Sequence, residues 1–447
     1  MRLAIIGGGG FRVPLVYRAL AQDTSGGRVT EVVLHDTDPD RVQAIDAVLA
    51  QQGSRYADSP AVRVAACVDE AVAGADFVFS AMRIGGLAGR VADERVAIAH
   101  GLLGQETVGA GGLAYGLRTI PAALELAGAV QRESNAAWLI NFTNPAGLVT
   151  EAMAGILGDR VVGICDSPLA LARRGARALG RPLDELEIDY AGLNHLGWLQ
   201  GLRDGETDLL PELLADDAAL APLEETQIFG ADWLRTLRAI PNEYLHYYYS
   251  AREAVAEQAA PGYATRGEYL AGQQGSCFHE LLARPDDALQ IWEGALAQRN
   301  SSYMASARGE GNERHEEDLV SGGYEGVALA LMAALARDEP ARLILNVRAG
   351  DRLGLPADAV VELPCAVDGS GIAPLPTSPL PLAAGGLVHQ VKGVERDLLA
   401  AALTGDPQLA VRAFATHPLI DSVEIARGVL TAYRAAIPEV DAVFAGR

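Results

Sequence analysis

Two side chains with metal-ligand chemistry follow separate predicted strands. Cys165 ends the apolar run RVVGIC and stands directly before Asp166, and His195 lies in the motif GLNHLGW. A thiolate and an imidazole, completed by oxygens of a substrate, suit a divalent metal in an open site. Each residue alone is also typical of a packed core position. The pair therefore gives two hypotheses, an open metal site or two buried side chains without chemistry.

Four consecutive glycines lie between the first predicted strand and a helix, in the stretch LAIIGGGGFRVP. They are Gly7, Gly8, Gly9 and Gly10. A tight glycine turn here lets backbone N–H groups approach a pyrophosphate at the helix N-terminus. The full G-x-G-x-x-G fingerprint is broken because Arg12 stands where the third glycine belongs. A plain strand-to-helix loop is the alternative.

Asp36 strengthens the case for a dinucleotide. It ends the second predicted strand, where a carboxylate accepts hydrogen bonds from ribose hydroxyls and favours NAD over NADP. The alternative makes Asp36 the cap of the predicted helix 39–52. The succession of strand, glycine turn, helix, strand and acid predicts dinucleotide binding.

Arginines and asparagines follow the third and fourth predicted strands. Arg83 and Arg90 lie in MRIGGLAGRVADER, among glycines that permit close approach of the backbone. A planar guanidinium suits a tetrahedral anion or several sugar hydroxyls, and surface salt bridges are the alternative. Asn141 and Asn144, in NFTNPAG, either contact a substrate or cap the next helix. Ligands collect at the carboxyl ends of strands in open α/β sheets, so these motifs predict one site.

Short apolar runs alternate with amphipathic stretches in the first half of the chain. The predicted strands are 2–6, 31–36, 75–81, 137–143 and 160–165. Stretches with helical spacing lie between most of them, at 12–22, 39–52 and 119–133. Buried strands separated by crossover helices indicate a parallel, doubly wound sheet.

The second half is organised differently. We expect strands of a second sheet over 187–202, mostly helices over 205–340 with a tyrosine-rich segment at 244–249, loop and extended chain over 356–390, and an amphipathic segment over 392–436. The fold class is thus α/β, with an N-terminal Rossmann-like doubly wound parallel sheet and a C-terminal α+β domain. The predicted domains are 1–166, which binds the dinucleotide, and 167–447, which binds substrate and forms oligomers.

Composition limits the function classes. A chain of 447 residues with 49% hydrophobic residues has material for two cores. The net charge of −22 argues against a nucleic-acid partner, since phosphate neutralisation needs clustered Lys and Arg. The chain has neither a long apolar run nor a leader pattern, so we expect a cytoplasmic protein without a membrane partner. The four cysteines form no CxxC motif, so other side chains must complete any cysteine-bound metal.

The chain resembles glycoside hydrolase family 4, the NAD- and manganese-dependent 6-phospho-glucosidases, which do not use the usual carboxylate pair. The similarity extends over nearly the whole chain. It comprises the blocks GGGG, RIGGLAGRVADER, HGLLGQETVGAGGLAYGLRTIP, NFTNPAG, CDSP, GLNHLGW, PNEYLHYYY and LPADAVVELPC. Several long blocks in one order are far more specific than any single motif.

The resemblance implies a redox-assisted elimination with NAD and Mn²⁺ as cofactors. NAD would accept hydride from C3 of the sugar, and the ketone would acidify the C2 proton, which a base removes as the C1 leaving group departs. Water would then add, and NADH would reduce C3 again. The implied substrate is a phosphorylated disaccharide or aryl glucoside, and the implied assembly is a homodimer or homotetramer.

The resemblance also implies roles for single residues. Cys165 and His195 match the metal ligands, Tyr244 matches the base and competes with its neighbours up to Tyr249, and Asp166 resembles the acid that protonates the leaving group. The implied substrate-binding residues are Arg90, Asn144, Glu106, Asn194 and Arg266. The implied cofactor-binding residues are Gly7, Gly8, Gly9, Gly10, Phe11, Arg12, Asp36 and Arg83.

Some blocks depart from the family pattern or point to different members. Gly10 and F-R-V-P replace the serine and Y-T-P of many relatives, which leaves the nucleotide contacts open. Asp166 is frequent in α-glucoside members, whereas GLNHLGW, PNEYL and GQET are more similar to 6-phospho-β-glucosidases. Hydrolysis of 6-phospho-β-glucosides is therefore the favoured function. A 6-phospho-α-glucosidase and an unphosphorylated glycosidase are the alternatives within the family.

Two alternatives come from other classes. An NAD-dependent 2-hydroxyacid dehydrogenase would share the first half of the fold, but lactate- and malate-type enzymes lack a pair such as Cys165 and His195. A non-enzymatic NAD-sensing module would leave Cys165, His195 and Tyr244 without a shared purpose. The predicted function is therefore enzymatic.

Overall fold

The chain divides into two units. The structure, a computed structural model, describes residues 1–301 and 323–445. Unit 1 comprises Met1–Val162, Arg252–Arg299 and Gln390–Arg447, and unit 2 comprises Gly163–Ala251 and Asn300–His389. The predicted domains 1–166 and 167–447 differ from this division, because two helical segments of the second half pack within unit 1. The part of the predicted helical region at 302–322 lies outside the described residues.

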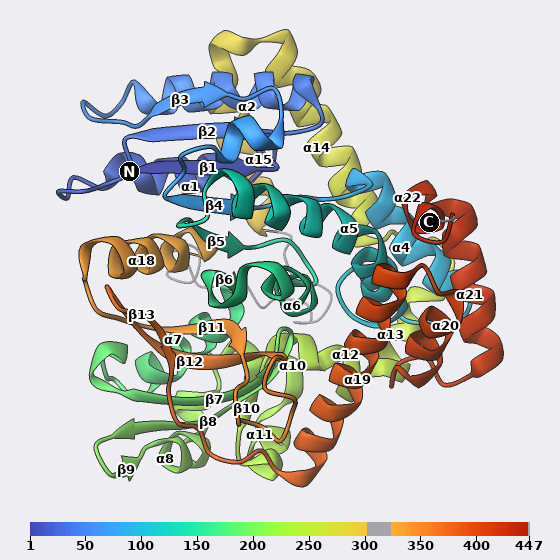
Figure 1. Ribbon diagram of the computed structural model, residues 1–447. Helices are drawn as coiled ribbons and strands as arrows, with labels where there is room; N and C mark the ends of the chain where they lie inside the picture. Colours follow the sequence, from blue (N-terminus) through green and yellow to red (C-terminus); the bar gives the residue numbers. More distant parts are fainter. Residues whose placement is uncertain (302–322, 446–447) are drawn as a thin grey trace. The chain divides into compact units, whose positions relative to one another are not determined.

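Unit 1 contains the predicted parallel sheet. Its strands are β1 (Arg2–Ile6), β2 (Glu31–His35), β3 (Ala61–Val64), β4 (Phe77–Ser80) and β5 (Trp138–Asn141). They lie in the order β3-β2-β1-β4-β5, and every neighbouring pair is parallel (Figure 1). The chain leaves β1 toward β2 and later crosses to β4 on its other side. The strand order reverses between β1 and β4, which is where open α/β sheets bind ligands.

Helices cover both faces of this sheet. The helices of the β-strand region are α1 (Val13–Gln22), α2 (Pro39–Gly53), α3 (Val68–Val72), α5 (Gly109–Glu133) and α6 (Ala146–Leu157). In α1, Val13, Val16, Tyr17 and Leu20 are buried, the spacing of one helix face. The helices α3, α5 and α6 bury apolar side chains against one face of the sheet. Right-handed crossovers place α1 and α2 on the opposite face. The predicted Rossmann-like fold is confirmed.

Further helices complete unit 1. They are α4 (Gly86–Ala99), α13 (Ala251–Gln258), α14 (Arg266–Ala283), α15 (Ala288–Ser301), α19 (Leu382–Thr404), α20 (Pro407–Thr416), α21 (Val423–Ala436) and α22 (Pro438–Ala442). Leu398, Phe414 and Tyr433 from the last helices share a core with Leu117 of α5 and Ala97 of α4. The predicted amphipathic segment 392–436 therefore belongs to the same core as the parallel sheet's helices.

Unit 2 is built on an antiparallel sheet, as expected for the α+β domain. Its strands are β6 (Val161–Ile164), whose first two residues belong to unit 1, β7 (Glu187–Leu193), β8 (Leu196–Asp204), β9 (Thr207–Asp208), β10 (Ile240–Pro241), β11 (Ala341–Arg348), β12 (Val360–Asp368) and β13 (Gly371–Pro374). The order is β10-β8-β7-β12-β11-β6, and the neighbours are antiparallel. Strands β9 and β13 pair with β8 and β12.

Short helices surround the sheet of unit 2. They are α7 (Ser167–Ala178), α8 (Leu210–Ala215), α9 (Asp217–Leu220), α10 (Glu224–Phe229), α11 (Ala231–Leu237), α12 (His246–Tyr249) and α18 (Tyr324–Arg337). Leu171, Leu199, Leu213, Leu234 and Ile344 are among the side chains that form their common core. The segment 356–390, predicted as loop and extended chain, contains the extended strands β12 and β13 and also the start of α19, which was not predicted. The strand β11, which follows the helical region, was not predicted either.

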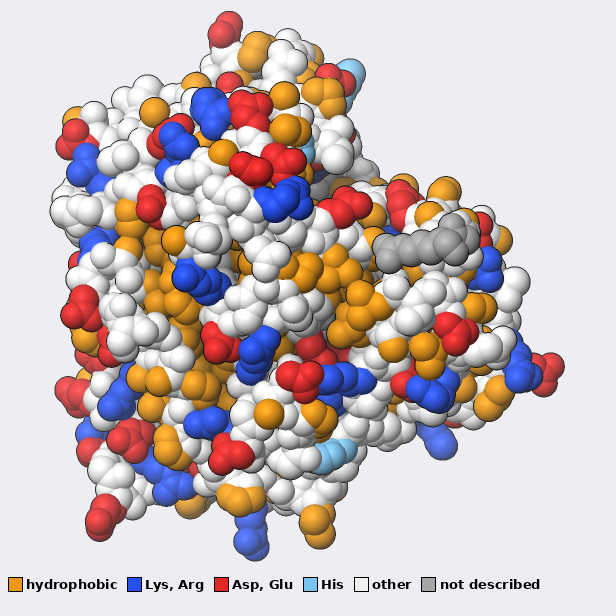
Figure 2. Space-filling model, in the orientation of Figure 1, with side chains coloured by type: hydrophobic (Ala, Val, Ile, Leu, Met, Phe, Trp, Pro, Cys, Tyr) orange, Lys and Arg blue, Asp and Glu red, His pale blue; other side chains and the backbone are white. Residues whose placement is uncertain are grey.

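The surface carries mixed charge. On the face drawn in Figure 2, Lys and Arg side chains are interspersed with Asp and Glu. Among the described helices, none combines the length and the apolar character that crossing a bilayer requires.

Candidate active site

The glycine turn of unit 1 is closely packed against the ends of three strands. The N–H groups of Gly7 and Gly8 both donate to the His35 carbonyl, at 2.9 and 2.8 Å. A Cβ on Gly7, whose φ is +91°, would lie 2.5 Å from the Ala81 carbonyl oxygen. A Cβ on Gly9 would lie 2.7 Å from Arg41 Cβ. Only glycine fits, so the backbone remains available for close approach by a ligand.

Asp36 belongs to this turn. Its Oδ2 accepts a hydrogen bond from the Gly9 N–H at 3.0 Å. The cap of α2 is Asp38, whose Oδ1 accepts from the Arg41 N–H at 3.1 Å. The helix-cap alternative for Asp36 is therefore wrong. Its second oxygen accepts from the Asp38 N–H at 3.2 Å, and ribose recognition by Asp36 stays a prediction.

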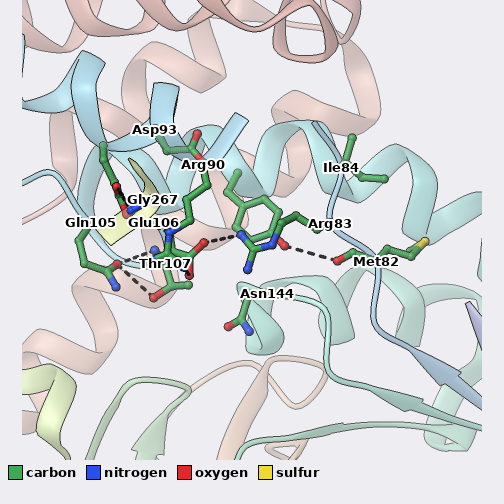
Figure 3. A network of polar contacts seen from close by, with 12 residues as sticks. Met82, Arg83, Ile84, Arg90, Asp93, Gln105, Glu106, Thr107, Asn144 and Gly267 are labelled. Carbon is green, nitrogen blue, oxygen red and sulfur yellow. Dashed lines mark hydrogen bonds and ion pairs between the residues drawn. The ribbon is translucent and has the colours of Figure 1, made fainter. Parts of the chain in front are cut away.

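Two of the predicted arginines converge on one carboxylate. Arg83 pairs with Glu106 Oε2, and Arg90 Nη1 lies 2.6 Å from Glu106 Oε1 (Figure 3). Burial raises the pKa of Glu106, but Arg83 and Arg90 outweigh it and lower that pKa to about 2. Arg90 also donates to Glu94 Oε1 at 3.0 Å. Glu106 is therefore ionised and holds both guanidinium groups in fixed orientations.

A buried ion pair supports the loop that carries Arg83. Arg118 binds both oxygens of Asp93 at 2.7 Å, and its Nε donates to the Ile84 carbonyl at 2.9 Å. Burial raises the pKa of Asp93 to about 7 against the opposing effect of Arg118. Both side chains are fully buried, so breaking the pair would leave an uncompensated charge.

The loops after β4 and β5 are tied together. The Met82 N–H donates to Thr143 Oγ1 at 2.9 Å, and Ser80 Oγ lies 2.9 Å from the same oxygen. Asn141 is buried and bonds Thr143 in both directions, so it holds the NFTN turn. Asn144 Nδ2 donates to the Phe142 carbonyl at 3.4 Å. The predicted arginine and asparagine motifs thus lie at neighbouring strand ends.

Three more arginines join Arg83 and Arg90, and one of them, Arg299, was not predicted. Burial lowers the pKa of Arg299 to about 9, and the positive charges that lower it further belong to Arg12, Arg90, Arg266 and Arg83. We name these five residues the arginine cluster. The N-terminus of α14 lies beside it, because the Gly267 N–H donates at 2.7 Å to Glu94, the partner of Arg90. The helix dipole adds to the positive potential of the cluster.

Phe11 and Arg12 follow the glycine turn toward this cluster. Trp292 Nε1 donates to the Phe11 carbonyl at 2.8 Å, and the Arg299 guanidinium lies 5.9 Å from the Phe11 ring. The Arg266 Nη2 donates to the Arg299 carbonyl at 3.3 Å. These contacts hold Phe11 beside Trp292 and Arg299, and contact of Arg12 with a dinucleotide stays a prediction.

In unit 2, the thiol of Cys165 has carboxylates around it. Cys165 follows β6 and is 5% exposed, and Asp166 is the N-cap residue of α7. Burial raises the pKa of the Cys165 thiol, and the charges of Glu362 and Asp166 raise it further. A hydrogen bond from the Ser167 N–H opposes them.

His195 lies at the tip of the β7–β8 hairpin and is buried. The Tyr244 ring stacks on its imidazole, with centroids 3.7 Å apart and planes at 9°. Asn242 Oδ1 accepts from the Tyr244 N–H at 3.0 Å, and this bond fixes the start of the Glu243–Leu245 turn. The side chains of His195 and Tyr244 therefore lie against each other in unit 2.

Two buried carboxylates connect Cys165 with His195. Glu243, beside Tyr244, accepts from Ser167 Oγ at 3.0 Å. Glu362 accepts from Asn194, beside His195, and its charge acts on the Cys165 thiol. Burial raises the pKa of Glu362 to about 7, and hydrogen bonds from Tyr190, Asn194 and Asn346 oppose it.

The other tyrosines of the predicted segment have different surroundings. The ring of Tyr247 lies 6.3 Å from that of Tyr244. The Tyr249 hydroxyl accepts from Trp198 Nε1 at 3.0 Å, and burial raises the pKa of Tyr249. Within residues 1–301 and 323–445, no three His, Cys, Asp or Glu side chains are arranged to hold a metal. The role of Cys165 and His195 as metal ligands stays a prediction.

Comparisons with known proteins agree over both halves of the chain. The sequence model described as "Family 4 glycosyl hydrolase" matches residues 2–181, and "Family 4 glycosyl hydrolase C-terminal domain" matches 190–420. A probable 6-phospho-β-glucosidase of Bacillus subtilis (strain 168) is 33% identical over 388 residues, which cover 83% of this chain and 81% of the relative. A 6-phospho-α-glucosidase of Leptotrichia buccalis is 27% identical over 451 residues, 96% of either chain.

A solved structure shares the fold. The 6-phospho-β-glucosidase from Thermotoga maritima, determined with manganese, NAD⁺ and glucose-6-phosphate, superposes with a TM-score of 0.82 at 28% identity. The match covers 98% of this chain and 99% of that one. The two family matches, taken with the 33% identical relative, place this protein: the chain belongs to family 4 of the glycosyl hydrolases.

Proposed function

We propose that the protein hydrolyses 6-phospho-β-glucosides with the help of NAD and Mn²⁺. The observation that supports a phosphorylated substrate is the arginine cluster of unit 1. Arg83 and Arg90 bind Glu106, and the positive charges of Arg12, Arg83, Arg90 and Arg266 act on Arg299, in a chain whose net charge is −22. A phosphate dianion suits the geometry of several converging guanidinium groups.

The cofactors fit the residues that the sequence motifs assign to them. The glycine turn with Asp36 would hold NAD, and Cys165 with His195 would hold the metal. When bound, NAD accepts and returns the C3 hydride, and the divalent metal polarises the C3 carbonyl as a Lewis acid. The Bacillus subtilis relative supports the β-glucoside, because it is more similar to this chain than the α-glucosidase relative is.

The chain's own residues would move the protons. Tyr244 is the proposed base for the C2 proton, since its stacking on His195 brings the phenol to the metal ligand. A nearby cation lowers the pKa of a phenol and so prepares it for this role. Asp166, at the start of α7, is the proposed acid for the leaving-group oxygen. Arg90, Asn144, Asn194 and Arg266 are the proposed contacts to the sugar and its phosphate.

The reaction class is tested with p-nitrophenyl 6-phospho-β-glucoside. We expect hydrolysis that requires both NAD and Mn²⁺ and produces no net NADH. Substrate deuterated at C2 should react more slowly or exchange its label with solvent. Full activity with complete retention of C2 deuterium would exclude elimination, and stoichiometric NADH would favour the dehydrogenase alternative. The α-anomer and the unphosphorylated glucoside, assayed in parallel, test anomer and phosphate preference.

Replacement of Arg299 by methionine tests the phosphate site. A charge-assisted hydrogen bond contributes about 1.5–3 kcal/mol, so KM for the phosphorylated substrate should rise roughly 10- to 150-fold, with little change in kcat. Steady-state kinetics with phosphorylated and free glucosides measure the effect. The control is Arg284→Met, which removes an exposed arginine of the same unit. Equal increases of KM for both substrates would contradict the phosphate assignment.

A further inference from the structure

Glu362 is a fully buried carboxylate in the middle of β12. Three side chains donate to it: the Tyr190 hydroxyl to Oε2 at 2.9 Å, Asn346 Nδ2 to Oε1 at 3.0 Å, and Asn194 Nδ2 to Oε1 at 3.4 Å. These donors come from β7, β11 and the β7–β8 tip. A carboxylate with this much support from neighbouring strands has one fixed orientation.

The β7–β8 tip depends on this carboxylate. Asn194 and His195 form the two-residue connection between the paired residues Leu193 and Leu196. His195 has a φ of +63°, a left-handed conformation that is uncommon for residues with a Cβ, although histidine adopts it more often than most. Asn194, directly before His195, is held by Glu362. The contact therefore acts on the residue that carries the imidazole.

A second feature of the same hairpin, the glycine at position 197, leaves space for a side chain that binds Glu362. A Cβ on Gly197 would lie 2.2 Å from the Tyr190 hydroxyl oxygen, the atom that donates to Glu362 Oε2. In the register of the sheet, Glu362 pairs with Gly192, and Gly192 pairs with Gly197. Gly197 thus leaves room for the Tyr190–Glu362 pair, whereas a Cβ on Gly192 would lie 2.2 Å from the Leu196 carbonyl oxygen.

Within residues 1–301 and 323–445, no Lys or Arg forms an ion pair with Glu362, so its three hydrogen bonds hold the carboxylate in place. In metal sites, outer carboxylates of this kind orient the ligands and raise affinity.

We propose that Glu362 is a positioning residue of the metal site: its carboxylate fixes the Asn194–His195 tip and thereby the imidazole that would bind the divalent ion. This inference rests on the proposed function, because it takes Cys165 and His195 as the ligands. Two variants test this role. Glu362→Gln keeps the size and an acceptor oxygen but removes the charge, whereas Glu362→Ala removes both.

The experiment measures Mn²⁺ binding to the full-length protein without NAD or sugar, by the EPR signal of free Mn²⁺. Outer-shell variants typically lose about 10- to 100-fold in metal affinity. We expect a loss in this range for Glu362→Ala and a smaller loss for Glu362→Gln. Asp189→Asn, a buried carboxylate on the same strand as Tyr190 but away from the tip, should bind like the wild type.

A cobalt-substituted sample reports ligand geometry independently of affinity. The thiolate-to-Co²⁺ charge-transfer band reports Cys165, and the d–d bands report the imidazole. We expect Glu362→Gln to keep the wild-type d–d spectrum and Glu362→Ala to change it. Wild-type affinity in both Glu362 variants would overturn the inference alone. Unchanged Mn²⁺ affinity in Cys165→Ser would instead overturn the ligand assignment of the proposed function. Glu362→Gln keeps the test decisive if Glu362→Ala does not fold.

Discussion

Cys165→Ser is expected to lower kcat/KM for 6-phospho-β-glucosides by about 10³-fold or more. A serine hydroxyl stays protonated near neutral pH and is a poor substitute for a thiolate ligand. Without the metal, the enolate formed by loss of the C2 proton has no Lewis acid to stabilise it. Such stabilisation contributes several kcal/mol, and about 4 kcal/mol corresponds to roughly 10³-fold in rate.

The measurement is steady-state hydrolysis with saturating NAD and a titration of Mn²⁺, so that weakened binding and lost chemistry are distinguished. The matched control is Cys67→Ser, because Cys67 is exposed in unit 1 and its side chain makes no capping bond to α3. Its activity should equal that of the wild type. Near-normal turnover in Cys165→Ser would exclude a role for the thiol in the metal site.

Tyr244→Phe is expected to lower kcat by about 10²- to 10⁴-fold, the usual contribution of a positioned general base. Phenylalanine keeps the ring that stacks on His195, so Mn²⁺ affinity should remain that of the wild type. The C2-deuterium isotope effect should increase, because proton removal becomes the slow step. The variant therefore separates proton transfer from metal binding.

Two neighbouring tyrosines serve as comparisons for this experiment. Tyr249→Phe removes only the acceptor of the Trp198 indole N–H and should change kcat little. Tyr247→Phe tests the competing assignment of the base. Wild-type kcat in Tyr244→Phe together with a large loss in Tyr247→Phe would transfer the role to Tyr247.

The local pattern of apolar residues was sufficient to predict the parallel sheet, but it did not predict every strand of unit 2. The apolar runs at 2–6 and 31–36 correspond to β1 and β2 because buried strands of a parallel sheet are apolar throughout. In contrast, β11 and β12 stabilise each other through pairs such as Leu343 with Cys365. Such pairing is not visible in either segment alone. The prolines around β12 favoured a loop, and the pairing overrides them.

For the candidate site too, the local sequence was sufficient to predict some residues but not others. Motifs at strand ends located the glycine turn, Arg83, Arg90, Cys165 and His195 because each stands out within a short window. Arg299 lies in an ordinary helical stretch, where an arginine is normally exposed. Its partial burial follows from tertiary packing that the local sequence does not record. Glu362 had a usable signal, since it is the single charged residue within the apolar run VVELPC.

The discontinuous course of unit 1 has a consequence for biosynthesis. The side chains of α4 and α5 that share a core with Leu398, Phe414 and Tyr433 emerge from the ribosome long before those partners exist. Because domains of a nascent chain generally fold from the N-terminus onward, unit 1 is an exception, since part of its core comes from the last helices. A stop codon near the 3′ end of the message would thus damage the part of the protein that is translated first.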